Sequence, residues 1–484
     1  MRTEEQSIII DRVKYINESL GVKAFAGTGK SFLLKEITQE YNTKNFLGLA
    51  FNASIVSENN SKFPKKNSLW FTVHGLARTF FENAKYDIGK IKTEYTIIEL
   101  IEILDIKHKD YYLAALILEV FDLFCNSNLR TIKYDPIITT AFIQRKQLIL
   151  NAQKEVLEIA LEKTVELWEK FRQKKIKATH SFYLKLFELK GLASKITKFD
   201  YILLDEAQDT NPTSLSIINQ IPAKKIFVGD PHQSIYAFRG VINAISMTEE
   251  QHYLSTTFRY QQHIADKASQ ILFNFKNEKK PIHSLASLSK DDKTTATLFR
   301  NNSSMIEEIN YFIENNIKYK TIKDPKSIFQ TAIVLLNFRL KNEKPIDKNY
   351  AYLHKMKDFE ELDKYIKESA DKELATANKM QKRFGKRLYF ILKDAKERFL
   401  EPYDNHIILS TGHNSKGLEW GIVNIYNDFP DIEKLMKKNK IVNTNDLLFK
   451  SSENCPISND IIQEINLRYV AFTRAKHTLN YHEK

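Results

Sequence analysis

The chain has 484 residues, of which 43% are hydrophobic and 27% are charged, as in a soluble globular protein of about three or four domains. No apolar run approaches the ~18 residues of a membrane span, and the first residues, MRTEEQSIII, lack the basic-then-apolar pattern of a signal peptide. Two cysteines, Cys125 and Cys455, exclude a disulfide framework and a cysteine metal cluster, so we expect a cytoplasmic protein with reduced thiols.

The formal net charge of +13 comes mostly from lysine. A basic excess is compatible with a partner that carries a phosphate backbone. An AT-rich genome also enriches lysine and asparagine regardless of function, so the charge does not distinguish these two explanations.

Short apolar runs that end in small or polar residues alternate with helical patterns, which predicts parallel sheets in an α/β fold. The first set comprises Val22–Ala26, Phe46–Phe51, Tyr201–Leu204 and Ile226–Val228. The second set comprises His252–Thr257, Thr294–Phe299, Ile407–Ser410, Ile422–Tyr426 and Thr478–Tyr481. We therefore expect two α/β domains in tandem.

Two helical stretches interrupt these sets and are interpreted as insertions after which the chain returns to its parent sheet. The first contains a long amphipathic segment from Gln144 to Lys175, and the second is rich in lysine and glutamate. The first expected domain comprises residues 1–77 and 181–245, and residues 78–180 form its insertion. The second comprises residues 246–340 and 399–484, and residues 341–398 form its insertion.

The segment Ala24–Ser31, AFAGTGKS, follows a predicted strand and precedes a helical run. Its glycines allow backbone N–H groups to close around phosphates at a helix N-terminus. Lys30 would contact the β- and γ-phosphates, and the Ser31 hydroxyl would bind magnesium. The predicted phosphate-binding residues are Ala26, Gly27, Thr28, Gly29, Lys30 and Ser31. A chance match in a flexible turn is the alternative, which the flanking strand and helix disfavour.

Asp205 and Glu206 follow the run Tyr201–Leu204, where doubly wound sheets place their ligands. Asp205 suits a magnesium ligand, and Glu206 suits the base that orients an attacking water. An acidic pair that caps the next helix is the alternative.

Gln233 follows the next apolar run and could hydrogen-bond a γ-phosphate or the attacking water. Tyr236, Phe238 and Arg239 come next, and aromatic residues two apart beside an arginine can stack on bases and contact their backbone. Aromatic residues are more often part of a core, so this spacing by itself leaves both interpretations open.

Two arginines, Arg259 in LSTTFRY and Arg474 in YVAFTRAK, are candidates for a cation on the γ-phosphate. Such a group supplied from another domain is worth about 10³–10⁵ in rate. Surface salt bridges are the ordinary alternative for isolated arginines.

These segments resemble the UvrD/Rep group of superfamily 1 helicases, and most closely its F-box DNA helicase branch, across nearly the whole chain. TEEQSIII is similar to the adenine-reading Q motif, AFAGTGKS to the phosphate loop, and LLDEAQDT and VGDPHQSIYAFRG to the hydrolysis and coupling motifs. LAFNASIVSENNSKFP with FTVHGLA, STGHNSKGLEW and EINLRYVAFTRAK are similar to the remaining motifs. The resemblance implies two tandem RecA-like P-loop motor domains, each with a helical insertion subdomain.

The resemblance also implies roles for individual residues. Gln6 and Phe258 would contact adenine, and Glu419 would contact the ribose. The second motor domain would supply Arg259 and Arg474, which complete a catalytic group with Lys30, Glu206 and Gln233 around ATP and Mg²⁺. The implied contacts with single-stranded DNA are Phe51, Asn52, His74, Tyr236, Phe238, Arg239 and His413.

The implied function is an ATP-dependent DNA helicase or translocase that moves on single-stranded DNA, 3′ to 5′, and unwinds tailed or forked duplex DNA. One alternative is a remodeller that strips proteins from DNA, or the motor subunit of a repair or anti-phage defence complex with a protein partner. A P-loop protein without nucleic acid is the third hypothesis.

The sequence departs from the family pattern at several positions. Ala24 replaces the usual first glycine of the phosphate loop, Ala53 replaces a residue that is often basic, and Gly421 replaces a residue that is usually acidic. No F-box segment precedes the Q motif, so we expect a helicase core alone.

Overall fold

The computed structural model describes residues 2–107, 110–135, 147–236, 240–287, 292–341, 350, 353, 356–369, 371–402, 406–452 and 455–481. The chain forms two compact units. Unit 1 comprises residues 1–94, 117–287 and 436–469, and unit 2 comprises residues 95–116, 288–435 and 470–484. Phe238 and Arg239 lie outside the described residues, so their DNA contacts stay predictions.

Unit 1 contains a six-stranded sheet in the order β3-β2-β4-β5-β1-β6, and all of its neighbouring strands are parallel. Parallel strands require crossover connections, and they place all their carboxyl ends at one edge of the sheet. The strands are β1 (Ser19–Ala24), β2 (Phe46–Leu49), β3 (Ser68–Phe71), β4 (Tyr201–Leu204), β5 (Lys224–Gly229) and β6 (Glu250–Leu254).

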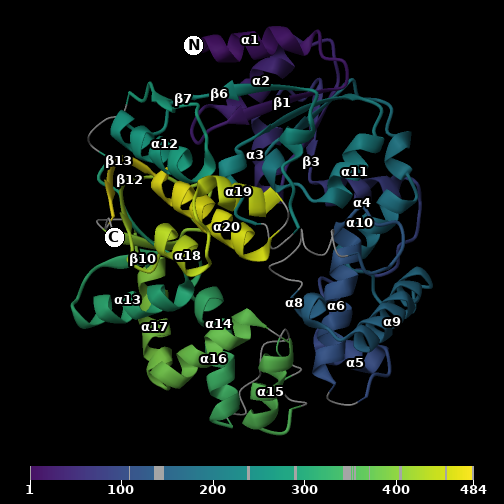
Figure 1. The fold of residues 1–484 in the computed structure, drawn as a ribbon, viewed down its shortest axis with the longest axis vertical. Helices are drawn as coiled ribbons and strands as arrows, with labels where there is room; N and C mark the ends of the chain where they lie inside the picture. The colour runs from purple at the N-terminus through teal and green to yellow at the C-terminus, as the bar shows by residue number, and fades with distance from the viewer. Residues whose placement is uncertain are drawn as a thin grey trace. The chain divides into compact units, whose positions relative to one another are not determined.

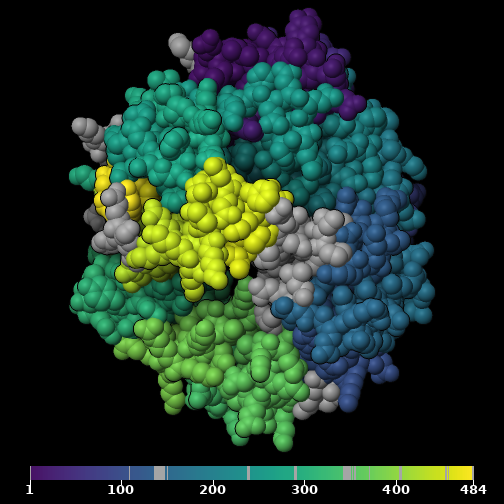
Figure 2. All heavy atoms as spheres, viewed as in Figure 1, coloured from purple at the N-terminus to yellow at the C-terminus, as the bar shows by residue number. Residues whose placement is uncertain are grey.

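Three helices from the first part of the chain pack on one face of this sheet (Figure 1): α1 (Glu4–Val13), α2 (Lys30–Glu40) and α3 (Ala53–Lys62). Strand residues alternate between the two faces, so Leu20 and Val22 of β1 join this core with Ile9 of α1 and Leu34 of α2. Burying each such side chain stabilises the fold by about 1.5–3 kcal/mol. The other side of α1 forms part of the surface, as Figure 2 shows in purple.

The remaining helices of unit 1 come from three parts of the chain: between β3 and β4, between β4 and β5, and after β6. They are α4 (Val73–Asn83), α8 (Gln147–Asn151), α9 (Lys154–Arg172), α10 (His180–Leu189), α11 (Pro212–Gln220), α12 (Gln262–Lys276) and α19 (Thr444–Ser452). Three helices contribute residues to both units: α6 (Tyr111–Asn126), α18 (Ile432–Lys438) and α20 (Pro456–Phe472).

Unit 2 contains a five-stranded parallel sheet in the order β10-β11-β9-β12-β13. Its strands are β9 (Thr295–Phe299), β10 (Tyr319–Thr321), β11 (Ile407–Thr411), β12 (Trp420–Ile425) and β13 (Ala475–Asn480). Its helices are α5 (Ile97–Ile103), α13 (Asn302–Glu314), α14 (Pro325–Arg339), α15 (Phe359–Ser369), α16 (Lys372–Phe384) and α17 (Arg387–Leu400). Helix α14 packs on α16 and α17.

The predicted α/β class with parallel sheets is confirmed, and the expected sheet of one strand is corrected. The sequence placed the run His252–Thr257 in the second α/β set, whereas β6 pairs with β1 in the first sheet. The expected domain bounds, including the start of the second domain at residue 246, stay predictions. Two further short strands, β7 (Thr256–Thr257) and β8 (His283–Ser284), pair with each other in unit 1. The segments 78–180 and 341–398 contain helices, and their status as separate insertion subdomains stays a prediction.

Among the described residues, none of the helices combines the length and the apolar character that crossing a bilayer requires.

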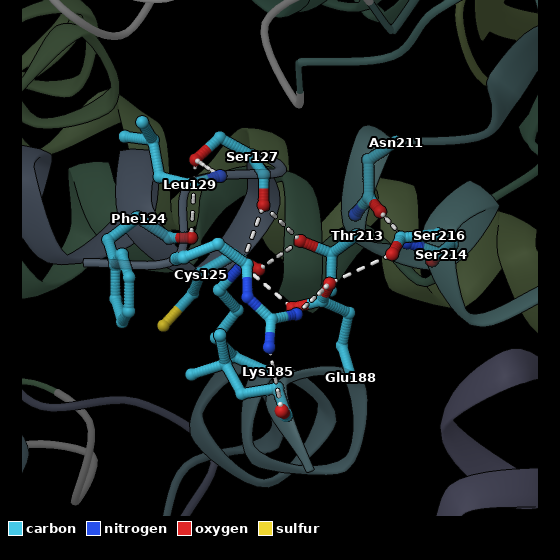
Figure 3. A network of polar contacts seen from close by, with 12 residues as sticks. Phe124, Cys125, Ser127, Leu129, Lys185, Glu188, Asn211, Thr213, Ser214 and Ser216 are labelled. Atoms are coloured by element: carbon cyan, nitrogen blue, oxygen red, sulfur yellow. Dashed lines mark hydrogen bonds and ion pairs between the residues drawn. The ribbon is translucent and has the colours of Figure 1, made fainter. Parts of the chain in front are cut away.

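A buried polar network joins the end of α6 to α10 and α11 in unit 1 (Figure 3). Lys185 on α10 is 0% exposed and donates to the Ser127 carbonyl at 2.9 Å and to Glu188 at 3.0 Å. The hydroxyl of Ser216 on α11 donates to Glu188 at 2.8 Å, and that of Thr213 lies 2.8 Å from the Ser127 carbonyl. Burial lowers the pKa of Lys185, and the carboxylate of Glu188 opposes that effect.

We expect Lys185→Met to reduce the free energy of unfolding by about 3 kcal/mol, because it leaves the carboxylate of Glu188 buried without its closest cation. Arg130, 3.5 Å from the same carboxylate, limits the loss. Chemical denaturation of the full chain measures the effect.

The matched control is Lys163→Met. Lys163 and Glu166 have the same three-residue spacing, but their side chains are 31% and 40% exposed, so we expect a loss below about 1 kcal/mol. Equal losses in the two variants would contradict a special contribution from the buried pair.

Candidate functional site

The phosphate loop connects β1 to α2, and two of its glycines have left-handed backbone angles. The φ of Gly27 is +76° and that of Gly29 is +83°, values that glycine adopts without strain. A Cβ on Gly27 would also lie 2.5 Å from the Cβ of Arg259, so only glycine allows this close approach. Helix α2 begins at Lys30, which places the helix N-terminus and its free N–H groups beside the loop.

Gln6 connects α1 to the phosphate loop. Its side-chain oxygen accepts from the backbone N–H of Thr3, while the Thr3 hydroxyl accepts from the N–H of Gln6, which completes a capping box. Its side-chain nitrogen donates to the carbonyl of Thr28 at 3.4 Å. Gln6 is therefore buried at the loop, and its predicted contact with adenine stays a prediction.

The ammonium of Lys30 lies 2.8 Å from the carboxylate of Glu206. Glu206 has φ +54°, an angle that costs a non-glycine residue about 1–3 kcal/mol and that is common at functional sites. Asp205 is buried, and its Oδ1 accepts from the backbone N–H of Glu206 at 2.9 Å. The predicted loop lysine and acidic pair are thus brought together.

Gln208 and Asp230, which the sequence pattern alone does not mark as site residues, extend this polar group. The side-chain nitrogen of Gln208 donates to Glu206, and its oxygen accepts from the backbone N–H of Asp230 at 3.0 Å. Gln233 donates to Oδ2 of Asp230 at 2.7 Å. Gln208 and Asp230 stand in segments that resemble family motifs, but the bond between them spans 22 positions of the sequence and could not be identified from spacing.

The segment after β6 lies against the phosphate loop. The hydroxyl of Thr257 donates to the carbonyl of Ala26 at 3.0 Å, and the N–H of Phe258 donates to the carbonyl of Gly27 at 2.9 Å. The side chain of Phe258 is 41% exposed. Phe258 and Arg259 fall in unit 1, and the expectation that the second α/β domain supplies Arg259 stays a prediction.

Two predicted DNA contacts, Phe51 after β2 and Tyr236 after β5, form a parallel aromatic pair. Their ring centroids are 5.5 Å apart and their planes differ by 7°. The neighbouring Asn52 caps α3, because its side chain accepts from the N–H of Ile55 at 2.9 Å. The structure therefore gives Asn52 a local structural role, and its DNA contact stays a prediction.

His74 lies in the first turn of α4, with its ring 6.3 Å from the ring of His180 and 6.1 Å from that of Tyr183. Burial and the neighbouring His180 lower the pKa of His74 to about 4. The imidazole is therefore neutral at pH 7.

In unit 2 the predicted site residues divide between the two edges of the parallel sheet. His413 follows β11 at the carboxyl edge, and burial and Arg300 lower its pKa to about 4. Glu419 and Arg474 directly precede β12 and β13 at the amino edge. Arg474 is buried, and its guanidinium donates to the carbonyl of Val470 at 2.9 Å.

Comparisons with known proteins agree with this arrangement. The family model of the UvrD/REP helicase N-terminal domain matches residues 3–254, and that of the UvrD-like helicase C-terminal domain matches residues 153–482. The parallel sheets and the glycine-containing loop between β1 and α2 define the class of the protein as a P-loop α/β protein. The chain belongs to the UvrD-like helicase family.

Three relatives show how far the similarity extends. F-box DNA helicase protein 1 of Schizosaccharomyces pombe is 28% identical over 99% of this chain and 57% of its own length. F-box DNA helicase 1 of Gallus gallus is 25% identical over 99% of this chain and 48% of its own length. The ATP-dependent DNA helicase PcrA of Leuconostoc citreum is 29% identical over 26% of this chain and 17% of its own length. The chain thus spans about half the length of the two F-box relatives.

We expect the free energy of unfolding to fall between about pH 7 and about pH 5, in part through His74. The pKa of His74 is depressed in the folded chain, so in this range the unfolded chain binds the proton and the folded chain does not. His74→Gln should remove that part of the pH dependence, at most about 2 kcal/mol over this range. Denaturation of both proteins at the two pH values measures it.

The control is His283→Gln, which removes an exposed imidazole on β8 of the same unit. A pH dependence that is the same in the wild type and in His74→Gln would contradict the assignment.

Proposed function

We propose that the chain is an ATP-dependent DNA helicase that moves 3′ to 5′ on single-stranded DNA and unwinds duplex DNA. One observation carries the proposal: a single edge of the unit 1 sheet holds both the Lys30–Glu206 pair and the parallel Phe51–Tyr236 pair. The first pair suits phosphoryl chemistry and the second suits base stacking. Membership in the UvrD-like helicase family supports the same conclusion.

For ATP hydrolysis, Lys30 would bind the phosphates and Glu206 would orient the attacking water. The contact between these residues brings Ser31 and Asp205, their sequence neighbours, into the same region. A hydroxyl and a carboxylate are oxygen ligands of the kind that Mg²⁺ prefers, so these two residues fit the ion. Bound Mg²⁺ would neutralise charge that develops on the phosphate oxygens.

Gln233 and two arginines would complete the set of residues around the γ-phosphate. Gln233 would hydrogen-bond the γ-phosphate or the water, and Arg259, whose backbone lies against the phosphate loop, would place a cation there. Arg474 would supply a second cation by family resemblance. Gln6, Phe258 and Glu419 would hold the adenosine, also by resemblance.

For DNA binding, Phe51 and Tyr236 would stack on bases, and His74 and His413 would contact the strand as neutral rings. Tyr236 and Gln233 lie on one short segment after β5. Movement of a base at the aromatic pair would therefore displace the residue proposed to contact the γ-phosphate. This proximity is a physical basis for coupling DNA binding to hydrolysis.

We expect single-stranded DNA to raise the ATPase rate, and the chain to unwind a duplex with a 3′ tail but not one with a 5′ tail. Steady-state ATP hydrolysis and strand-displacement assays measure the two properties. Preference for the 5′ tail would contradict the proposed polarity. DNA-stimulated hydrolysis without unwinding of either duplex would favour the protein-stripping remodeller over the helicase.

The phosphate-loop assignment is tested within the same assay by Lys30→Ala. Loss of this charge should reduce ATP turnover by about 10²–10³-fold, the effect of removing one electrostatic group from a reaction site. Unchanged thermal unfolding would show that the fold is retained. Turnover close to that of the wild type would refute the assignment.

We expect Phe51→Ala to weaken binding of single-stranded DNA about tenfold, because stacking of one base on an aromatic ring is worth about 1–3 kcal/mol. Fluorescence anisotropy with a labelled oligonucleotide measures the affinity. Phe273→Ala, which removes an exposed ring on α12, is the matched control and should bind as the wild type does. Equal affinities of the two variants for the oligonucleotide would contradict base stacking by Phe51 and leave it a structural role.

A further inference from the structure

Tyr469 on α20 connects the phosphate loop to the segment after β5, and all of these residues belong to unit 1. The backbone N–H of Ala26 donates to the Tyr469 hydroxyl at 3.1 Å, and that hydroxyl donates to Oδ2 of Asp230 at 3.0 Å. The side chain of Tyr469 is 0% exposed. One hydroxyl therefore joins two segments that follow neighbouring strands, β1 and β5.

The chemistry of the position requires a group that both accepts and donates a hydrogen bond, which a phenol hydroxyl does. Ala26 is buried, so its N–H needs an acceptor, and Asp230 is buried, so its carboxylate needs donors. Burial and the nearby charge of Asp230 raise the pKa of Tyr469 well above its ordinary value. The hydroxyl thus stays protonated and able to donate.

Asp230 in turn determines where Gln233 lies. Its Oδ1 accepts from the backbone N–H of His232 at 3.0 Å, and its Oδ2 accepts from the side chain of Gln233 at 2.7 Å. The Tyr469 hydroxyl is the second donor to that Oδ2. The carboxylate is thus held from both sides, and Gln233 is held by the carboxylate.

Further contacts of α20 hold the same segment. Asn466, one turn before Tyr469, donates to the carbonyl of Ser234 at 2.7 Å. The ring of His232 stacks on Phe25 of the phosphate loop at 5.8 Å and meets the ring of Tyr469 edge-on at 6.0 Å. The segment that carries Gln233 is therefore clamped between the loop and α20.

We infer that Tyr469 is a positioning residue for ATP hydrolysis, which fixes Asp230, and through it Gln233, relative to the phosphate loop. The inference rests on the proposed function, because it concerns the same ATP site. It predicts a defect in turnover and not in nucleotide affinity, since Tyr469 itself would not touch the nucleotide.

The test is Tyr469→Phe in the full chain, with the kcat and KM for ATP measured in the presence of single-stranded DNA. We expect kcat to fall roughly tenfold and KM to change less than about twofold, the pattern of an interaction that matters in the transition state. Tyr41→Phe is the matched control: its hydroxyl donates to the carbonyl of Ile10 at 2.8 Å, away from the loop, and both constants should be unchanged.

A double variant tests whether Tyr469 acts through Gln233. If it does, Tyr469→Phe combined with Gln233→Ala should turn over ATP no more slowly than Gln233→Ala alone. Multiplication of the two single effects, a rise in KM with unchanged kcat, or wild-type kinetics in Tyr469→Phe would each overturn the inference.

Hydrogen–deuterium exchange separates failure of this inference from failure of the proposed function. Tyr469→Phe removes the acceptor of the Ala26 N–H, so exchange of that amide should accelerate relative to the wild type and to Tyr41→Phe. An inactive wild type would refute the proposed ATPase, while the exchange rate would still report the contact. Unchanged exchange at Ala26 in an active enzyme would overturn the role of Tyr469.

Discussion

Parallel pairing of β1 with its neighbours is the constraint on which the rest of unit 1 depends. In this pairing Val22 lies opposite Val228 of β5 and His252 of β6, so the three strands end at the same edge. After these three strands the chain continues as the phosphate loop, as the segment that carries Gln233 and as the segment that carries Arg259. Reversal of either outer strand would move its segment to the opposite edge and separate the site residues.

Bringing these segments together creates a second requirement, because each contributes polar groups that are shielded from water. An unpaired buried group costs about 1–3 kcal/mol, so the groups must bond to one another. Gln208 satisfies this requirement by bonding Glu206 and the backbone of Asp230, which themselves bond Lys30 and Tyr469. The left-handed backbone of Glu206 costs a similar amount, and the contacts of its carboxylate offset that strain.

Local chemistry explains which parts of this arrangement could be predicted from the sequence. The phosphate loop and the acidic pair each follow an apolar run that predicts a strand, so the sequence could place Lys30 and Glu206 at strand ends, and the structure brings them within 2.8 Å. Their catalytic roles stay predictions. The strand that pairs with β6 could not be predicted, because an apolar run has the same pattern in either sheet. Tyr469 could not be assigned either, since its role depends on Ala26 and Asp230, which are far from it in sequence.

The same distinction applies to Asn52, whose side chain completes the first turn of α3. A residue at a position that resembles a DNA contact of the family can therefore also cap a helix, and the spacing of the motif does not show this second role.

The electrostatic character of the proposed DNA contacts differs from that of the chain as a whole. The chain carries a net charge of +13, yet the rings of Phe51, Tyr236, His74 and His413 are uncharged at pH 7, the two imidazoles because their pKa is lowered to about 4. Stacking on neutral rings releases no counterions, whereas lysine contacts to phosphates do. In the proposed function, the salt dependence of DNA binding would therefore arise from lysines and arginines elsewhere, while the aromatic pair would supply an attraction that salt does not screen. Such a division would suit the proposed translocation, because every base has a face that stacks on an aromatic ring, so the pair would accept each base in turn without sequence preference.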